Sequence, residues 1–298
     1  SSPQVELLVS DLEKLQTKTA AIVKEEYLRF CSDLVSESDL FEDADRIVSA
    51  ADFYQCGAQS AVSLNLSRPH LCSTERCSSV VVKGLRHPLI ELFCTDEVYV
   101  PNDVSLTDTN NGILLYGTNA VGKSSLIKAL GICVVLAQAG MFVPCVDLQL
   151  APYKGIFTRI LGNDDIYRGL STFAVEMSEL RNILIECDKH TLVLGDELCS
   201  GTESRSAHCI FAAGIEWLHN KNSSFLFATH FHEIAKFPQI KALERLSFHH
   251  MKVNYDVEDD VLIYDRRLAP GMGDMMYGLE VCKALNLPGD FLRRANGL

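Results

Sequence analysis

The chain has 298 residues, 47% of them hydrophobic and 22% charged, and its formal net charge is −12. This composition can bury the core of one large domain or of two. The acidic balance argues against a surface dominated by phosphate contacts with nucleic acid, although a basic surface on other domains of a larger assembly stays open.

The eleven cysteines form no C-x-x-C pair, and Cys72 and Cys77 have no matching His/Cys pair nearby, so we do not expect zinc. The count is odd and most cysteines sit in apolar runs, which predicts reduced core residues of an intracellular protein.

Neither a signal peptide nor a membrane span is expected. The longest apolar stretch, about Leu130–Val143, is interrupted by Gln138 and Gly140 and is too short to cross a bilayer. Because the chain starts at Ser1 rather than Met, we expect a piece of a longer polypeptide.

Two helices are predicted first. The apolar seam of the first follows steps of three and four and is typical of a long helix or a short coiled coil: Val5, Leu8, Leu12, Leu15, Thr19 and Ile22. The second helix starts near Leu40 with Asp39 as its N-cap. Neither carries recognisable chemistry, so a packing role is expected. The polar stretch Ser67–Ser79 marks a boundary, which divides the chain into 1–75 and 76–298.

Strands alternate with helices in the second part. The expected strands are Val80–Val82, Ile113–Tyr116, Gly155–Ile160, Thr191–Leu194 and Phe225–Ala228, and helices are expected over Ser125–Ala139, Phe173–Cys187 and Ser204–Leu218. Leu246–Tyr255 and Val261–Leu268 flank an acidic turn as in a hairpin. Continuously apolar strands between helices predict an α/β fold with a mixed, mostly parallel sheet covered by helices on both faces, preceded by a short all-helical segment.

A glycine-rich loop between the strand that ends at Tyr116 and the following helix is the first candidate site. It has the pattern G-x-x-x-x-G-K-S of a phosphate-binding P-loop: Gly117, Thr118, Asn119, Ala120, Val121, Gly122, Lys123 and Ser124. Its backbone N–H groups and the helix dipole favour a polyphosphate. Lys123 can reach the β- and γ-phosphates, and the Ser124 hydroxyl can ligate Mg²⁺. The alternative is a glycine-rich turn that matches by chance, which the strand–loop–helix context disfavours.

A second candidate lies where the strand Thr191–Leu194 ends in Gly195-Asp196-Glu197, the Walker B pattern. Asp196 is expected to hold Mg²⁺ together with Ser124. Glu197 is expected to polarise a water molecule, which points to hydrolysis; the alternative is an acidic N-cap for the next helix. His230 follows the strand that ends at Ala228, where it could sense a γ-phosphate, although a lone histidine is more often a structural hydrogen-bonding group.

The chain resembles the C-terminal half of the MutS family of DNA mismatch-repair ATPases. The matching motifs follow the family order: Arg86-His87-Pro88, Gly117–Ser125 (GTNAVGKSS), Phe142-Val143-Pro144, Phe157–Ile160, Ser171–Met177 (STFAVEM), Asp196-Glu197 with Gly201-Thr202, Ala228-Thr229-His230 and Tyr277-Gly278-Leu279. Glu176–Arg181 and Leu198–Glu203 look closer to the organellar and viral branch.

The resemblance implies an ATPase fold of ABC type with ATP and Mg²⁺ as cofactors. It implies that Lys123, Ser124 and Ser125 belong to the nucleotide site and that Asn119 lies near the γ-phosphate. It further implies that Asp196 completes the metal site, Glu197 activates water and His230 senses the γ-phosphate. Tyr99 would take the place of an aromatic residue that stacks on adenine, and Ser171 would reach a partner's nucleotide in trans.

The same resemblance implies a homodimer or heterodimer with a MutS-like subunit, in which the ATP state moves a clamp on double-stranded DNA carried by domains absent here. Residues 1–75 would be the end of the lever region. The family pattern is not kept at Thr118, Val121 and Gly195, and we expect Gly195, in place of a bulky residue, to loosen the packing next to Asp196.

Two other functions stay open. One is a different ABC-type ATPase, such as a transporter motor or a chromosome-maintenance head, although no LSGGQ signature is present. The other is a nucleotide-binding module without turnover, which the intact Lys123, Ser124, Asp196 and Glu197 argue against. The sequence does not distinguish mismatch recognition from recombination as the role of the parent protein.

Overall fold

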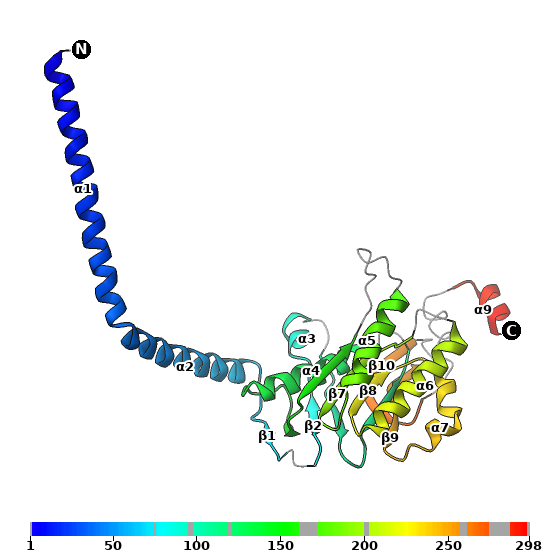
Figure 1. Ribbon diagram of the computed structural model, residues 1–298. Helices are drawn as coiled ribbons and strands as arrows, with labels where there is room; N and C mark the ends of the chain where they lie inside the picture. Colours follow the sequence, from blue (N-terminus) through cyan, green and yellow to red (C-terminus); the bar gives the residue numbers. More distant parts are fainter. Residues whose placement is uncertain are drawn as a thin grey trace. The chain divides into compact units, whose positions relative to one another are not determined.

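The structure is a computed structural model that describes residues 2–73, 76–94, 98–118, 121–160, 172–199, 203–256, 261–273 and 287–296. The chain divides into two compact units, 1–59 and 60–298 (Figure 1). The second unit includes β1 (His70–Leu71), which lies ahead of the boundary expected at residue 75.

Two long helices begin the chain, α1 (Pro3–Ser36) and α2 (Ser38–Ser63). The predicted apolar seam lies on α1, and no residue of either helix is buried within the described structure. Asp39 is not the N-cap of α2, because Leu40 and Phe41 donate backbone hydrogen bonds to the Glu37 carbonyl oxygen (3.1 and 3.3 Å). The helix therefore starts ahead of Asp39, which lies in its first turn.

A six-stranded sheet forms the centre of the second unit (Figure 1). Its spatial order is β10-β9-β4-β8-β7-β6. The strands are β4 (Gly112–Tyr116), β6 (Gly155–Arg159), β7 (Thr191–Asp196), β8 (Ser224–Ala228), β9 (Leu246–Asp256) and β10 (Val261–Pro270). All neighbouring pairs are parallel except β9 and β10, which form an antiparallel hairpin. The carboxyl ends of β4, β8 and β7 thus meet at one edge.

Alternate residues of the central strands enter two separate cores. On one face Ile113 and Leu115 of β4 pack in the core that includes α4 (Lys123–Gln138). On the other face Leu114 and Tyr116 pack in the core that includes α5 (Thr172–Glu186) and α6 (Ser204–Asn220). This double coverage explains why β4 is apolar throughout rather than alternating. The mixed α/β architecture with helices on both faces agrees with the prediction.

A second sheet of four strands packs on the α4 side and was only partly predicted. Its order is β1-β5-β2-β3, with β2 (Ser79–Leu85), β3 (Asn102–Leu106) and β5 (Asp147–Ala151). In β3, Asn102, Val104 and Leu106 are buried while the residues between them are exposed. The short helices are α3 (Pro88–Phe93), the 3₁₀ helix η2 (His232–Lys236), α7 (Pro238–Lys241) and α9 (Gly289–Asn296).

The expectation that the cysteines are mainly core residues is wrong. All ten that the structure describes are free, but only Cys133, Cys145, Cys187 and Cys199 are buried. The others lie on helices and loops outside the two cores. No helix in the described ranges is long and apolar enough to cross a membrane.

The packing around Gly195 is tight, contrary to the loosening that we expected. A Cβ atom at Gly195 would lie 2.1 Å from Cε1 of Phe227, the neighbouring residue on β8. The Phe227 ring therefore occupies the space that a larger residue would need, and it is almost completely buried.

We predict that Gly195→Ala lowers the free energy of unfolding by about 1–3 kcal/mol, because the Phe227 ring must move within a filled core. Urea unfolding measures this loss. Gly155→Ala is the control, since its Cβ would meet nothing closer than 3.6 Å. Equal stability of the wild type and Gly195→Ala would contradict the packing described here.

Candidate nucleotide and metal site

The P-loop begins where β4 ends. Gly117 (φ 148°) and Gly122 (φ 102°) adopt backbone conformations that favour glycine, and Gly122 is the N-cap of α4. Val121, which departs from the family pattern, is completely buried, and its Cγ2 atom would lie 3.1 Å from a Cβ at Gly117. The side chain of Val121 therefore closes the loop against the core and leaves Gly117 no room for a side chain.

The Lys123 side chain folds back into this loop. Its Nζ atom donates hydrogen bonds to the carbonyl oxygens of Gly117 (2.5 Å) and Thr118 (2.9 Å). The residue is only 5% exposed, and burial lowers its pKa, while the carboxylates of Glu197 and Asp196 oppose that shift. The ammonium group is thus held at the loop by backbone oxygens and two nearby acids.

Ser124 and Asp196 meet across the sheet edge. The Ser124 hydroxyl donates a hydrogen bond to Oδ2 of Asp196, although β8 separates the strands β4 and β7. The other carboxylate oxygen, Oδ1, is buried without a hydrogen-bond partner in the described structure. A hydroxyl beside a carboxylate with a free, buried oxygen provides the hard oxygen ligands that Mg²⁺ prefers. The described residues contain no cluster of three His, Cys, Asp or Glu side chains for a metal, so the remaining ligands of such an ion would have to come from elsewhere.

The turn after Asp196 has an unfavourable backbone conformation. Glu197 (φ 53°) and Cys199 (φ 67°) lie in the left-handed region, which costs about 1–3 kcal/mol for each non-glycine residue. Two hydrogen bonds hold the turn: Glu197 N donates to the Ala228 carbonyl oxygen (3.0 Å), and Cys199 N donates to Oε1 of Glu176 (2.7 Å). Glu176 thus positions the segment that carries Glu197.

Glu176 is itself buried beside a cation. Its carboxylate lies 3.8 Å from Nε of Arg159, which is 3.1 Å from Glu179. Glu176 and Arg159 belong to the motifs noted in the sequence, but no sequence pattern predicts a role for them in the site. Their role becomes visible only from the register of β6 against β7 and from the position of α5, which bring Arg159 and Glu176 next to the turn after Asp196.

His230 contacts both Glu197 and Lys123. Its Nε2 atom is 2.6 Å from Oε1 of Glu197 and 3.4 Å from Nζ of Lys123. One ring nitrogen either donates to the carboxylate or accepts from the ammonium group, and the shorter distance favours donation to Glu197. The hydrogen bond from Thr229 N to the Leu115 carbonyl oxygen (3.0 Å) fixes this segment next to the P-loop strand.

A cavity of about 220 Å³ connects these elements. It is lined by Thr118, Gly122, Lys123, Ser124, Ser125, Glu197 and Arg266. Arg266, from β10, was not predicted as a site residue.

Tyr99 is not among the described residues that line this cavity; its ring lies 6.4 Å from that of His87, and burial raises its pKa to about 12. Asn119, Ala120, Ser171, Gly201, Thr202 and Tyr277–Leu279 lie outside the described residues.

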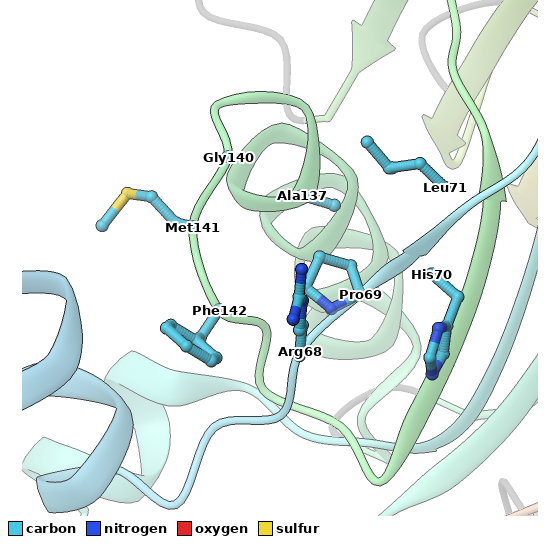
Figure 2. Close-up of a pocket in the computed structure, with 8 residues that line it drawn as sticks. All are labelled: Arg68, Pro69, His70, Leu71, Ala137, Gly140, Met141 and Phe142. Atoms are coloured by element: carbon cyan, nitrogen blue, oxygen red, sulfur yellow. The ribbon is translucent and has the colours of Figure 1, made fainter. Parts of the chain in front are cut away.

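A larger cavity, of about 620 Å³, lies at the opposite end of α4. Figure 2 shows that its walls come from the segment through β1 and from the end of α4 with the loop after it: Arg68, Pro69, His70, Leu71, Ala137, Gly140, Met141 and Phe142. The 16 residues of α4 separate it from the P-loop by about 24 Å. Cavity size therefore does not point to the candidate site in this fold, because the predicted site residues Lys123, Ser124 and Glu197 line the smaller cavity.

Comparison with known proteins agrees with this geometry. The family model of MutS domain V matches residues 113–298. The chain belongs to the MutS family. It is 35% identical to a putative DNA mismatch repair protein, a mutS homolog of Acanthamoeba polyphaga mimivirus, over 95% of this chain and 29% of that protein. It is 38% identical to the mitochondrial DNA mismatch repair protein mutS homolog of Sarcophyton glaucum, over 94% of this chain and 28% of that protein.

A bacterial protein is also among the relatives. The DNA mismatch repair protein MutS of Lactobacillus delbrueckii subsp. bulgaricus is 34% identical over 86% of this chain and 29% of that protein. The family predicted from the motifs is confirmed, and a viral and a mitochondrial relative are among the matches. The MutS-family chain spans less than a third of the length of these curated relatives.

We predict that Glu176→Gln lowers the free energy of unfolding by about 1–3 kcal/mol, because it removes a buried charge that faces Arg159 and weakens the bond to Cys199 N. The matched control is Glu179→Gln, whose side chain is 46% exposed and whose ion pair contributes about 0–1 kcal/mol. Urea unfolding of both variants provides the comparison. Equal losses would mean that Glu176 has no special role in holding the turn.

Proposed function

We propose that this chain is the ATP-binding and ATP-hydrolysing part of a MutS-like DNA mismatch-repair protein, with a P-loop fold of ABC type. The observation that carries the proposal is the contact between Ser124 and Asp196 beside Lys123, with a buried Asp196 oxygen that has no partner in the described structure. A phosphate-binding loop and a carboxylate that meet at one hydroxyl are the arrangement expected for a nucleotide with Mg²⁺.

The residues divide the work by their chemistry. Lys123 offers an ammonium group to the β- and γ-phosphates, in exchange for its bonds to the Gly117 and Thr118 carbonyl oxygens. Ser124 and Asp196 would hold Mg²⁺, and the ion would supply positive charge that offsets the charge of the phosphates. Asn119 is assigned to the γ-phosphate and Tyr99 to adenine by resemblance alone.

Glu197 would orient and deprotonate the attacking water. Its carboxylate accepts from His230 in the structure, so a γ-phosphate that attracts His230 would release Glu197 for the water. His230 would in this way report the presence of the γ-phosphate to the catalytic base. Glu197 lines the cavity, and Nε2 of His230 lies 2.6 Å from its Oε1 atom.

The assembly of the chain is proposed from the family resemblance. By resemblance, the chain works as a homodimer or heterodimer in which Ser171 reaches the partner's nucleotide, and the ATP state moves a clamp on double-stranded DNA carried by other domains. Residues 1–75 are assigned to the end of the lever region, and the intracellular location stays a prediction. The relatives are named for DNA mismatch repair, and this chain matches less than a third of the length of each.

We predict that Glu197→Gln binds ATP with Mg²⁺ as the wild type does but hydrolyses it about 10²–10⁴-fold more slowly, because only the base is lost.

We predict that Lys123→Ala loses nucleotide binding, because the ammonium group proposed to contact the β- and γ-phosphates is removed. The control is Lys128→Ala, which removes an exposed lysine from the same helix. Calorimetric titration and phosphate release measure the two properties separately.

These measurements also separate the alternatives. A nucleotide-binding module without turnover would bind ATP, but its wild-type rate would equal that of Glu197→Gln. Normal ATP affinity of Lys123→Ala would remove the P-loop assignment altogether.

A further inference from the structure

Two buried thiols contact each other on and beside α4. Cys133, on α4, is completely buried, and Cys145, which lies just ahead of β5, is only 3% exposed. Both are free and belong to the same core, and a hydrogen bond joins their side chains. A pair of thiols in direct contact can be joined by oxidation, which a single buried thiol cannot.

The backbone before Cys145 is held by two other segments of the chain. Val143 exchanges two hydrogen bonds of 2.9 Å with Ser67, N to O in both directions. The carbonyl oxygen of Pro144 accepts from Arg86 N (2.8 Å). The Cys145 thiol is therefore kept in place against α4 by hydrogen bonds that lie outside the helix.

The surroundings of Cys145 favour its ionised form. The Ser67 hydroxyl lies 3.6 Å from Sγ of Cys145, within hydrogen-bond distance for sulfur. Hydrogen bonds with Cys133 and Ser67 and the charge of Arg86 lower the pKa of Cys145, while burial and the carboxylate of Asp147 oppose the shift. The contact with Cys145 and burial both raise the pKa of Cys133. Cys145 is thus the sulfur that ionises, and the thiolate is the nucleophilic form of cysteine.

The 620 Å³ cavity at the end of α4 brings solvent close to this pair. Ala137, in its wall, lies one turn after Cys133 on the same side of α4, about 6 Å along the helix axis (Figure 2). Arg68, another wall residue, directly follows Ser67 in the chain. Neither thiol is among the described residues that line the cavity. A small oxidant therefore has a short path to the pair, and a bulky reagent does not.

We propose that Cys133 and Cys145 are a site of reversible oxidation by hydrogen peroxide, with Cys145 as the attacking sulfur and Cys133 as the resolving one. The Cys145 thiolate attacks one peroxide oxygen, the O–O bond breaks as the S–O bond forms, and the departing hydroxide takes up the proton that Cys145 released. Cys133 then attacks the sulfenic acid sulfur, and its proton leaves with the hydroxyl group as water. Two thiols are oxidised to one disulfide, and one peroxide is reduced to two water molecules.

The test treats the reduced, folded full chain with hydrogen peroxide, blocks the remaining thiols by alkylation and locates the products by mass spectrometry. The wild type should gain a Cys133–Cys145 disulfide that dithiothreitol removes. In Cys133→Ser, oxidation should stop at a Cys145 sulfenic acid that dimedone traps, whereas Cys145→Ser should leave Cys133 reduced. Ser67→Ala should slow the cross-link about 2- to 10-fold, because Cys145 loses a hydrogen bond.

The matched control is Cys187→Ser. Cys187 is also buried, but its thiol donates to the Leu184 carbonyl oxygen (3.5 Å), so the cross-link should form at the wild-type rate in this variant. Urea unfolding checks that each variant is folded. In the wild type, a Cys145 that stays reduced while the exposed Cys209 is oxidised would overturn the inference, as would a Cys145 disulfide with a cysteine other than Cys133. Nucleotide binding does not enter these measurements, so either result would leave the proposed function intact.

Discussion

The hydrogen bond between Ser124 and Asp196 is the interaction on which the site depends. It joins the first turn of α4, the helix that follows β4, to the end of β7. The strands β4 and β7 are not neighbours in the sheet, because β8 lies between them. The contact exists because β4, β8 and β7 run parallel and end together, and because Gly122 starts α4 in a left-handed conformation directly at that edge. The two cores bury all of β4.

Around this contact the chain uses backbone conformations that ordinary residues avoid. Glu197, Cys199 and Arg266 all have positive φ values, at a cost of about 1–3 kcal/mol each. Each is held by a hydrogen bond with another element: Glu197 N donates to the Ala228 carbonyl oxygen, Cys199 N donates to Glu176, and the Arg266 carbonyl oxygen accepts from Asn102. Two of them, Glu197 and Arg266, line one cavity. Asn65 and Asn222 also have positive φ values and lie outside this cavity lining.

The parts that the sequence predicts are those that depend on local pattern. The buried strands contain continuous apolar runs, Leu192–Leu194 in β7 and Phe225–Ala228 in β8, and the P-loop spacing is contiguous in sequence. Strands β3 and β5 were missed because they are short and alternate polar with apolar residues, so only pairing with β2 identifies them. The contact between Asn102 and Arg266 could not be predicted from the sequence. The two residues are 164 positions apart, and Arg266 lies in a register shift of the β9–β10 pair. Gly195 was misjudged for a similar reason, since the ring that fills its space belongs to β8.

The most direct test of the central claim is Mn²⁺ binding, followed by electron paramagnetic resonance in the presence of a non-hydrolysable ATP analogue. Mn²⁺ prefers the same oxygen ligands as Mg²⁺. If Ser124 and Asp196 hold one ion, the wild type should bind Mn²⁺ only with nucleotide, and Ser124→Ala and Asp196→Asn should each weaken it. The double variant should then lose little more than the stronger single variant, because the two effects belong to one coordination sphere. Unchanged Mn²⁺ affinity in both single variants, with the nucleotide still bound, would contradict the account.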